Sequence, residues 1–262
     1  MLHRFSSVLA RVSIPIVLIL LLSACGFGDS KDPTPTPTLQ PEVTVPLAPG
    51  QLSVGQLLDG IEASAGSIVS ARTVFTTTTT DGTPTTSATT TEEFIAPDKR
   101  RIQTTNGSTV IDDQIRIGSA IYMRGSFVVS AVAPMLTSDT WVTVDPSLVP
   151  ADTPVGNVVT YLTSPFRLPF TSVSDEMRGR GVTQVGQIQS GGRTCTVWTF
   201  VDTSDFGDRI DYALSIDAQG LPCSLIERAG TIENVTTFEF NIPGLEIIAP
   251  DSATSVSGTP EG

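Results

Sequence analysis

The feature that most constrains the fold of this chain is a long succession of short β-rich runs separated by turn residues. The first two runs, Val69–Thr80 and Thr85–Ala96, are dense in threonine and are separated by the pair Asp81-Gly82. β-Branched residues favour strands, and Asp-Gly is a strong hairpin signal. The runs that follow are Lys99–Thr105, Thr109–Ile117, Ala120–Arg124, Ser126–Ala133, Trp141–Asp145, Thr183–Gln189, Arg193–Asp202, Arg209–Asp217, Pro222–Ala229 and Thr231–Asn241. Short connections of this kind predict an antiparallel meander.

Two apolar patterns with helical spacing interrupt the strands. The first follows Ser53, a suitable N-cap, and comprises Val54, Leu57, Leu58 and Ile61. The second begins after a cap at Asp152 or Thr153, has Pro154 in its first turn, and comprises Val155, Val158, Val159 and Leu162. Pro165 ends this second helix, and a weaker helical piece is expected over Ser174–Arg178.

The N-terminal segment predicts export. A basic head containing Arg4 and Arg11 precedes an apolar run from Ile14 to Leu22, which is shorter than the roughly 20 residues that a bilayer span needs. The stretch Leu22-Ser23-Ala24-Cys25-Gly26 then resembles a bacterial lipobox. That resemblance implies cleavage of residues 1–24 and acyl chains such as palmitate on Cys25. The alternative is an ordinary secretory signal with a chance cysteine.

Composition divides the remainder of the chain. Residues 25–50 hold the lipid anchor and a Pro/Thr-rich tether, which cannot bury a core and favours an extended spacer. Residues 51–250 are long enough for one domain with a substantial core. The segment 251–262 is small and polar, and is expected to be a flexible tail.

Cleavage before Cys25 changes the inventory of reactive side chains. It removes Arg4, Arg11 and His3, the single histidine, and leaves 13 basic and 27 acidic residues, a net charge of −14. Such a chain repels phosphate backbones, so nucleic-acid binding is excluded. The lack of histidine excludes Ser-His-Asp and Cys-His catalysis and histidine-based metal sites, so no catalytic residue, metal or cofactor is expected.

Two cysteines remain after Cys25 is acylated, Cys195 and Cys223. An oxidising compartment favours their pairing as a disulfide, and a buried pair of free thiols is the alternative.

Three sets of short motifs stand in the strand regions: Gln114–Arg124 followed by Trp141, Gly191–Trp198 followed by Asp217–Pro222, and Phe238, Asn241 and Pro243 followed by Ile248–Pro250. Together with the order of the elements, these motifs resemble those of the LolA/LolB and LppX/LprG superfamily. The resemblance implies an α+β, mainly β fold: a strongly curved antiparallel sheet, a half-open barrel of about 11 strands, with two or three helices covering its concave side. It also implies an apolar cavity for acyl chains. No arginine maps clearly onto the gating arginine of the LolA carrier, and Arg116 and Arg124 are candidates by location only.

The apolar faces of the expected helices either pack the core or line that cavity. The residues expected to line it are Leu57, Leu58, Ile61, Val158, Val159, Leu162 and Phe166. Phe166, Leu168 and Phe170, which stand around Pro169, form either a mobile flap at the cavity mouth or a loop pinned to the sheet.

Two carboxylate pairs resemble acid–base groups, Asp112-Asp113 and Asp175-Glu176. Neighbours on a strand point to opposite faces, so Asp112 and Asp113 cannot cooperate. Acids at a helix N-terminus are favoured by the helix dipole, which explains Asp175 and Glu176. All four are interpreted as solvated acids.

These observations predict a non-enzymatic lipoprotein outside the cytoplasm, anchored to the cell membrane (or an outer membrane) by its acyl group. Its expected partner is a lipid or acylated molecule, bound in an apolar cavity for transport or presentation. The alternative is a non-catalytic protein-interaction or envelope-sensing module on the same fold, with a protein partner.

Overall fold

The computed structural model describes residues 51–79, 88–125, 135–170, 173, 175–204 and 207–256. The expected signal segment, Cys25, the expected tether, the turn expected at Asp81-Gly82 and the strand expected over Ser126–Ala133 lie outside the described residues.

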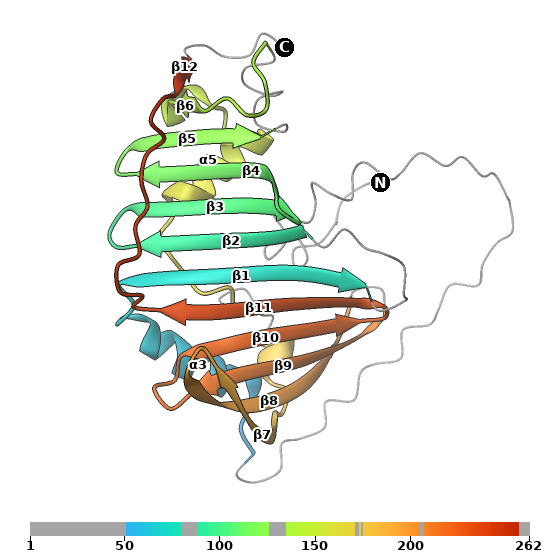
Figure 1. Ribbon diagram of the computed structural model, residues 1–262. Helices are drawn as coiled ribbons and strands as arrows, with labels where there is room; N and C mark the ends of the chain where they lie inside the picture. The colour runs from blue at the N-terminus through green and yellow to red at the C-terminus, as the bar shows by residue number, and fades with distance from the viewer. Residues whose placement is uncertain are drawn as a thin grey trace, which may run out of the picture.

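A single 12-stranded sheet forms the body of the molecule (Figure 1). Its strands are β1 (Ser70–Thr79), β2 (Ala88–Ile95), β3 (Lys99–Asn106), β4 (Thr109–Ile117), β5 (Ala120–Gly125), β6 (Val142–Val144), β7 (Thr183–Ser190), β8 (Arg193–Thr203), β9 (Arg209–Asp217), β10 (Pro222–Ala229), β11 (Ile232–Phe240) and β12 (Thr254–Val256). Their spatial order is β12-β6-β5-β4-β3-β2-β1-β11-β10-β9-β8-β7.

The sheet consists of two consecutive meanders joined through strands that are far apart in sequence. Strands β1 to β6 form the first meander and β7 to β11 the second, and β1 pairs with β11 over nine residue pairs, from Ala71↔Phe240 to Thr79↔Ile232. Every neighbouring pair is antiparallel except β12 with β6. The curved, mainly β, open sheet confirms the expected fold class, with twelve strands in place of about eleven.

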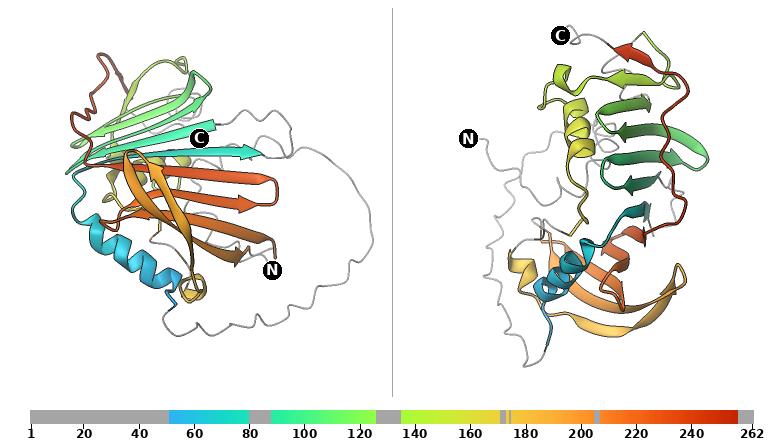
Figure 2. Two further views of the ribbon diagram at one scale, coloured as in Figure 1. Left: turned by 60° about the horizontal axis from the view of Figure 1, so that its bottom comes forward. Right: turned by 90° about the vertical axis from the view of Figure 1, so that its left-hand side faces the viewer.

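In the described part of the chain, the sheet is accompanied by the α-helices α3 (Val54–Ala65), α5 (Pro154–Thr163) and α6 (Asp175–Arg178) and the 3₁₀ turn η1 (Pro146–Leu148). The capping signals are confirmed, since Ser53 and Gln56 form a reciprocal capping box at α3. Thr153, one of the two candidates, caps α5 by accepting a hydrogen bond from the Gly156 amide. Figure 2 shows α3 and α5 on the same side of the sheet, whose β7 end curves toward α3.

Buried apolar side chains gather in two clusters. The α3 cluster contains Val54, Leu58, Ile61, Leu168, Phe170, Met177, Val182, Phe200, Leu214, Ile216, Leu225 and Phe238. The α5 cluster contains Ile121, Met123, Val142, Val144, Val155, Val158, Val159 and Leu162. The core is therefore divided, with each long helix covering its own half of the sheet.

The prediction of a flexible tail after Pro250 is wrong for Thr254–Val256. These residues form β12, which pairs in parallel with β6. The preceding segment follows the ends of the strands from β11 back to β6 (Figure 1), and its Ile247 is buried. This route places the Thr254 amide 2.8 Å from the Trp141 carbonyl oxygen, which it donates to. Composition could not reveal a pairing partner that lies more than 100 residues away.

No helix among the described residues is long and apolar enough to cross a membrane.

Candidate lipid-binding face

Cross-strand register defines one face of the sheet, which we call the helix face. Residues directly opposite each other in neighbouring strands share a face. Arg100 of β3 lies opposite Arg116 of β4, and both donate hydrogen bonds to carbonyl groups at the C-terminal end of α5. The helix face of the central strands therefore comprises Thr73, Phe75 and Thr77 of β1, Thr90, Glu92 and Phe94 of β2, Arg100, Ile102 and Thr104 of β3, and Asp112, Gln114 and Arg116 of β4.

The seven residues expected to line a cavity are divided between the two clusters. Leu58 and Ile61 are buried in the α3 cluster, with Leu57 and Phe166 partly buried against it. The other three, Val158, Val159 and Leu162, are buried in the α5 cluster. The structure thus brings the α3 residues and Phe166 together, and the α5 residues together, but it does not unite all seven in one lining.

The segment from Pro165 to Phe170 lies against the sheet. The ring of Phe166 stacks on Phe94 of β2, with centroids 4.5 Å apart and planes 9° apart. Leu168 and Phe170 are buried, and Phe170 contacts the ring of Phe238. Of the two alternatives for these residues, the loop pinned to the sheet is the arrangement seen.

A buried polar group fastens α5 to the helix face. Arg100 is 4% exposed, donates to Glu92 at 2.6 Å and to the Tyr161 carbonyl at 2.7 Å, and lies over the Tyr161 ring. The Tyr161 hydroxyl donates to the second oxygen of Glu92 at 2.8 Å. Burial, followed by the nearby Glu92 charge, raises the pKa of Tyr161, so the phenol remains a neutral donor. Arg116 adds hydrogen bonds to the carbonyls of Leu162 and Thr163.

The role of Arg100 was not predicted from the sequence, and the sequence pattern that indicates it is weak. Arg100 stands in the run Lys99-Arg100-Arg101 at the start of a strand, and alternation puts Arg100 and Arg101 on opposite faces. One of the two guanidinium groups therefore had to point toward the helices.

The solvated interpretation of Asp112 and Asp113 is wrong, although the two side chains do point to opposite faces. Asp113 is fully buried on the outer face and accepts hydrogen bonds from Arg101, Gln103 and Arg124. These donors come from the neighbouring strands β3 and β5, so the partners of Asp113 could not be identified before the strand register was known.

Asp112 is in a different situation. It is 8% exposed on the helix face, and its Oδ1 atom is buried without a hydrogen-bond partner. Desolvation raises the pKa of this carboxyl group. Asp175 and Glu176 are exposed in the first turn of α6, where negative charge is favourable.

The half of the helix face farthest from Arg100 and Arg116 is rich in hydroxyl groups, and we call it the threonine half. The hydroxyls of Thr90 and Thr104 lie 3.2 Å apart. Thr77 donates to Asn234 of β11 at 2.9 Å. Phe75, Asp112 and Glu227 of β10 also lie in this half, and none of the described strand residues there is a lysine or arginine. Burial raises the pKa of Glu227.

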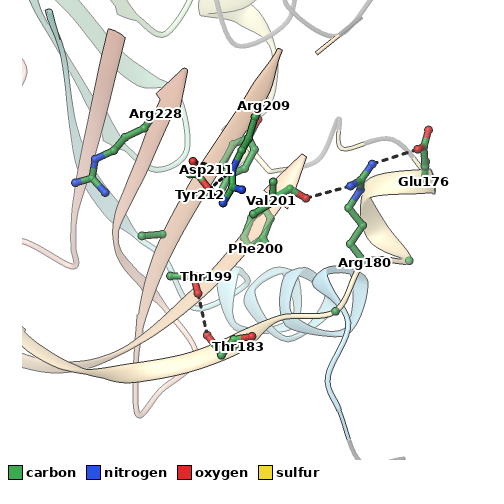
Figure 3. Close-up of a pocket in the computed structure, with 13 residues that line it drawn as sticks. Glu176, Arg180, Thr183, Thr199, Phe200, Val201, Arg209, Asp211, Tyr212 and Arg228 are labelled. Carbon is green, nitrogen blue, oxygen red and sulfur yellow. Dashed lines mark hydrogen bonds and ion pairs between the residues drawn. The ribbon is translucent and has the colours of Figure 1, made fainter. Parts of the chain in front are cut away.

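A pocket of about 520 Å³ lies elsewhere, beside β8, β9 and α6 (Figure 3). Its arginines are already neutralised. Arg180 pairs with Glu176 and Asp202, Arg209 with Asp211, and Arg228 with Glu233. A second pocket of about 550 Å³ adjoins η1. None of the residues expected to line a cavity contributes to either pocket.

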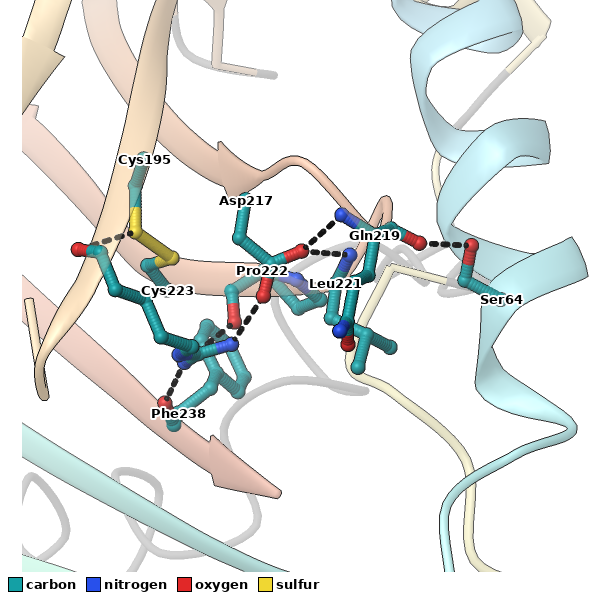
Figure 4. A network of polar contacts seen from close by, with 9 residues as sticks. Ser64, Cys195, Asp217, Gln219, Leu221, Pro222, Cys223 and Phe238 are labelled. Carbon is teal, nitrogen blue, oxygen red and sulfur yellow. Dashed lines mark hydrogen bonds and ion pairs between the residues drawn. A yellow bond between two sulfur atoms is a disulfide. The ribbon is translucent and has the colours of Figure 1, made fainter. Parts of the chain in front are cut away.

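The disulfide between Cys195 and Cys223 is present and joins β8 to β10 (Figure 4). Beside it, Arg193 donates to Asp217 at 2.7 Å and to the Phe238 carbonyl at 2.6 Å. Asp217 accepts hydrogen bonds from the backbone amides of Gln219 and Leu221, and these bonds close the turn after β9. This arrangement is structural, and it holds β8, β9, β10 and β11 in register.

No group of three or more His, Cys, Asp and Glu side chains that could hold a metal ion occurs among the residues that the structure describes.

Comparisons with known proteins give distant structural similarities only. No family model matches the chain, and no curated protein matches it. Among solved structures, Mycobacterium tuberculosis lipoprotein LppX has a TM-score of 0.43 and 12% identity, covering 71% of this chain and 94% of LppX. LprF from Mycobacterium bovis also has a TM-score of 0.43 and 12% identity, covering 78% of this chain and all of LprF.

A LolA superfamily protein from Nitrosomonas europaea has a TM-score of 0.28 and 7% identity, covering 72% of this chain and 92% of that protein. LppX and the LolA superfamily, both named in the resemblance above, are thus among the structures to which this chain is similar. The similarities are too distant to carry over a ligand or a partner.

Proposed function

We propose that this chain binds the acyl chains of a lipid or lipidated molecule on the helix face and holds it for transport or presentation, without catalysis. The supporting observation is the division of the core. Beside the two clusters, apolar side chains are only partly buried: Leu57 and Phe166 pack against the α3 cluster, Ile102 packs against the α5 cluster, and Phe75 and Phe94 lie on the helix face of β1 and β2. Covering such side chains with a ligand contributes about 0.8 kcal/mol per buried methylene.

The threonine half suggests the chemistry of the head group. Hydroxyl and amide side chains there offer donors and acceptors, while Asp112 and Glu227 supply only negative charge. An anionic head group would be repelled by these carboxylates and would find no arginine or lysine on the described strands there. We therefore propose a hydroxyl-bearing head group without negative charge.

Acylation of Cys25 would confine this binding face near the membrane from which it takes up its ligand. At about 3 Å per residue, the 25–50 tether allows a reach of roughly 75 Å.

The test uses the mature chain with Cys25→Ser, so that no acyl anchor contributes lipid. Organic extraction followed by mass spectrometry identifies any co-purified lipid, and fluorescent fatty-acid titration measures uptake. We expect a glycosyl diacylglycerol to compete better than a phosphatidylglycerol with the same acyl chains. Phe166→Asp should weaken uptake at least tenfold, whereas Leu148→Asp, at an exposed position on η1, should not change it.

Three outcomes would contradict the proposal in different ways. If no bound lipid is found and no fatty acid is taken up, lipid binding would be overturned and the protein-interaction module would be favoured. Equal competition by the two lipids would overturn only the head-group assignment. Equal uptake by both aspartate variants would place the ligand away from the helix face.

A further inference from the structure

Strand β7 leaves one edge of the sheet open in the described part of the chain. It pairs with β8 alone, and its residues from Thr183 to Gln189 are exposed. The strand at the opposite edge, β12, has three residues, whereas β7 has eight. The unpaired backbone groups of an edge strand are a template for another strand, and edges are ordinarily protected by charges, prolines, a bulge or a covering segment.

Protection of this kind is confined to the beginning of β7. An isolated bridge covers Gly181, before the strand starts, and a bulge lies between Gln184 and Gly186. From Gly186 to Ser190 the strand pairs regularly with β8 and contains neither a charged residue nor a proline. Ile188, in the middle of this regular part, is 41% exposed. The regular part of β7 is therefore an unprotected edge with an apolar side chain at its centre.

The charge of the chain favours contact between copies at this edge. The chain has 27 acidic and 15 basic residues, so copies of it repel one another. In contrast, the stretch from Thr183 to Gly192 holds no charged residue, and Arg193, which follows it, is paired with Asp217. Two copies can therefore meet along β7 without bringing unpaired charges together.

We propose that β7 pairs in the antiparallel direction with β7 of a second copy of the chain, about a two-fold axis. The turn after the strand determines which backbone groups are available. Gly191-Gly192 has φ values of 56° and 75°, as in a two-residue hairpin turn, and such a turn directs the carbonyl group of Ser190 toward β8. Alternation then directs the backbone groups of Ile188 toward β8, and those of Gln187 and Gln189 outward.

The outward groups define the register of the pairing. Gln187 forms a hydrogen-bonded pair with Gln189 of the second copy, and the two-fold axis generates the converse pair. Between these pairs, Ile188 lies opposite Ile188 of the second copy, in a pair without backbone hydrogen bonds, where side chains come closest. The pairing covers the exposed isoleucine and extends the sheet through both copies. This inference does not depend on the ligand proposed above.

Sedimentation equilibrium of the mature Cys25→Ser chain tests the association. We expect the measured mass to double as the protein concentration rises. Ile188→Lys places two like charges opposite each other and should raise the dissociation constant by about tenfold or more. Ile232→Lys is the matched control, because Ile232 is 45% exposed but lies in β11, which is paired on both sides, and it should leave the association unchanged.

A cysteine at the same position tests the register. The Cα atoms of two residues opposed in such a pair lie about 4.5 Å apart, which is within reach of a disulfide. Ile188→Cys in the Cys25→Ser chain should therefore cross-link two copies when oxidised glutathione is added, and Ile232→Cys should not.

A chain that stays monomeric at every concentration would overturn the proposal. Association that Ile188→Lys leaves unchanged, or that both lysine variants weaken equally, would also overturn it, because the contact would then lie away from β7. Association that Ile188→Lys abolishes, without cross-linking of Ile188→Cys, would overturn the two-fold register.

Discussion

Arg100 contacts Tyr161 twice: its guanidinium carbon lies 3.9 Å from the centre of the tyrosine ring, and its Nη1 donates to the carbonyl oxygen of the same residue. Glu92 closes the group by accepting from both Arg100 and the Tyr161 hydroxyl. A charge buried in this way stabilises the fold only while its partners are present. The position of α5 over the helix face therefore depends on this group.

Arg100→Leu should lower the free energy of unfolding by about 3 kcal/mol, because it removes the cation paired with the partly buried Glu92 carboxylate and the hydrogen bond to the Tyr161 carbonyl. Denaturant unfolding measures the change. Arg72→Leu is the matched control, since Arg72 pairs with Glu93 and Glu239 but is 36% exposed, and its loss should cost less than about 1 kcal/mol. Equal losses in the two variants would show that Arg100 does not fasten α5.

Asp112 and Asp113 are adjacent but should respond oppositely to amidation. Asp113→Asn should destabilise the fold by about 3 kcal/mol, since two arginine side chains lose their shared carboxylate. Asp112→Asn should stabilise it at neutral pH, because its Oδ1 is buried without a partner. Urea unfolding of both variants measures this contrast, and destabilisation by both would contradict it.

Asp112 also predicts that the stability of the fold depends on pH. The folded-state pKa of Asp112 is raised by desolvation, so the folded chain binds a proton more tightly than the unfolded chain does. Stability is consequently lost as the pH rises from the unfolded pKa, near 4, through the raised folded pKa. The advantage of Asp112→Asn over the parent should grow across that range and then stay constant. Unfolding curves measured from pH 4 to pH 8 test this, and a constant difference over that range would refute it.

Local signals predicted the elements of this fold well. The bounds of β4, β9 and β10 agree with the expected runs, and Ser53 and Thr153 cap their helices, because strand runs and caps depend on residues close together in sequence. The contacts between residues far apart in the sequence could not be predicted. Arg100 and Tyr161 are 61 residues apart, and the sequence offers no register that would align them.

The candidate site was predicted in its parts but not in its assembly. The apolar faces of α3 and α5 were identified from spacing alone, and most of those residues are buried. Whether two helices share one lining depends on where each crosses the sheet. That depends in turn on the β1–β11 pairing, which places α3 and α5 over different halves. Helical periodicity carries no information about such distances.

Removal of the disulfide should destabilise the domain by about 3–4 kcal/mol, the chain-entropy value for a loop closed across a sequence separation of 28 residues. The double variant Cys195→Ser/Cys223→Ser should unfold at lower denaturant than the parent, and a reductant should shift the parent to the same midpoint without affecting the variant. If reductant leaves the unfolding midpoint of the parent unchanged while the double variant is still destabilised, the lost packing of the two cysteines would be the cause.

The turn after β9 offers a comparison of two glycines. Gly220 and Gly207 have φ values of 83° and 87°, so alanine is strained at either position by roughly 1 kcal/mol. A Cβ on Gly220 would also lie 2.5 Å from the Ser64 hydroxyl, which bonds the Gly60 and Gln219 carbonyls, whereas a Cβ on Gly207 meets nothing within 4 Å. Gly220→Ala should therefore cost about 1–2 kcal/mol more than Gly207→Ala in chemical unfolding.

Ser64→Ala should remove most of that excess, because the clash and the displaced hydrogen bonds both involve its hydroxyl group. A double-mutant cycle of Ser64→Ala with Gly220→Ala isolates this coupling, and the same cycle with Gly207→Ala should be additive within about 0.5 kcal/mol. Additive behaviour in the Gly220 cycle would mean that the turn shifts freely away from α3. The contact between Ser64 and Gln219 would then not hold the β9–β10 turn against the helix.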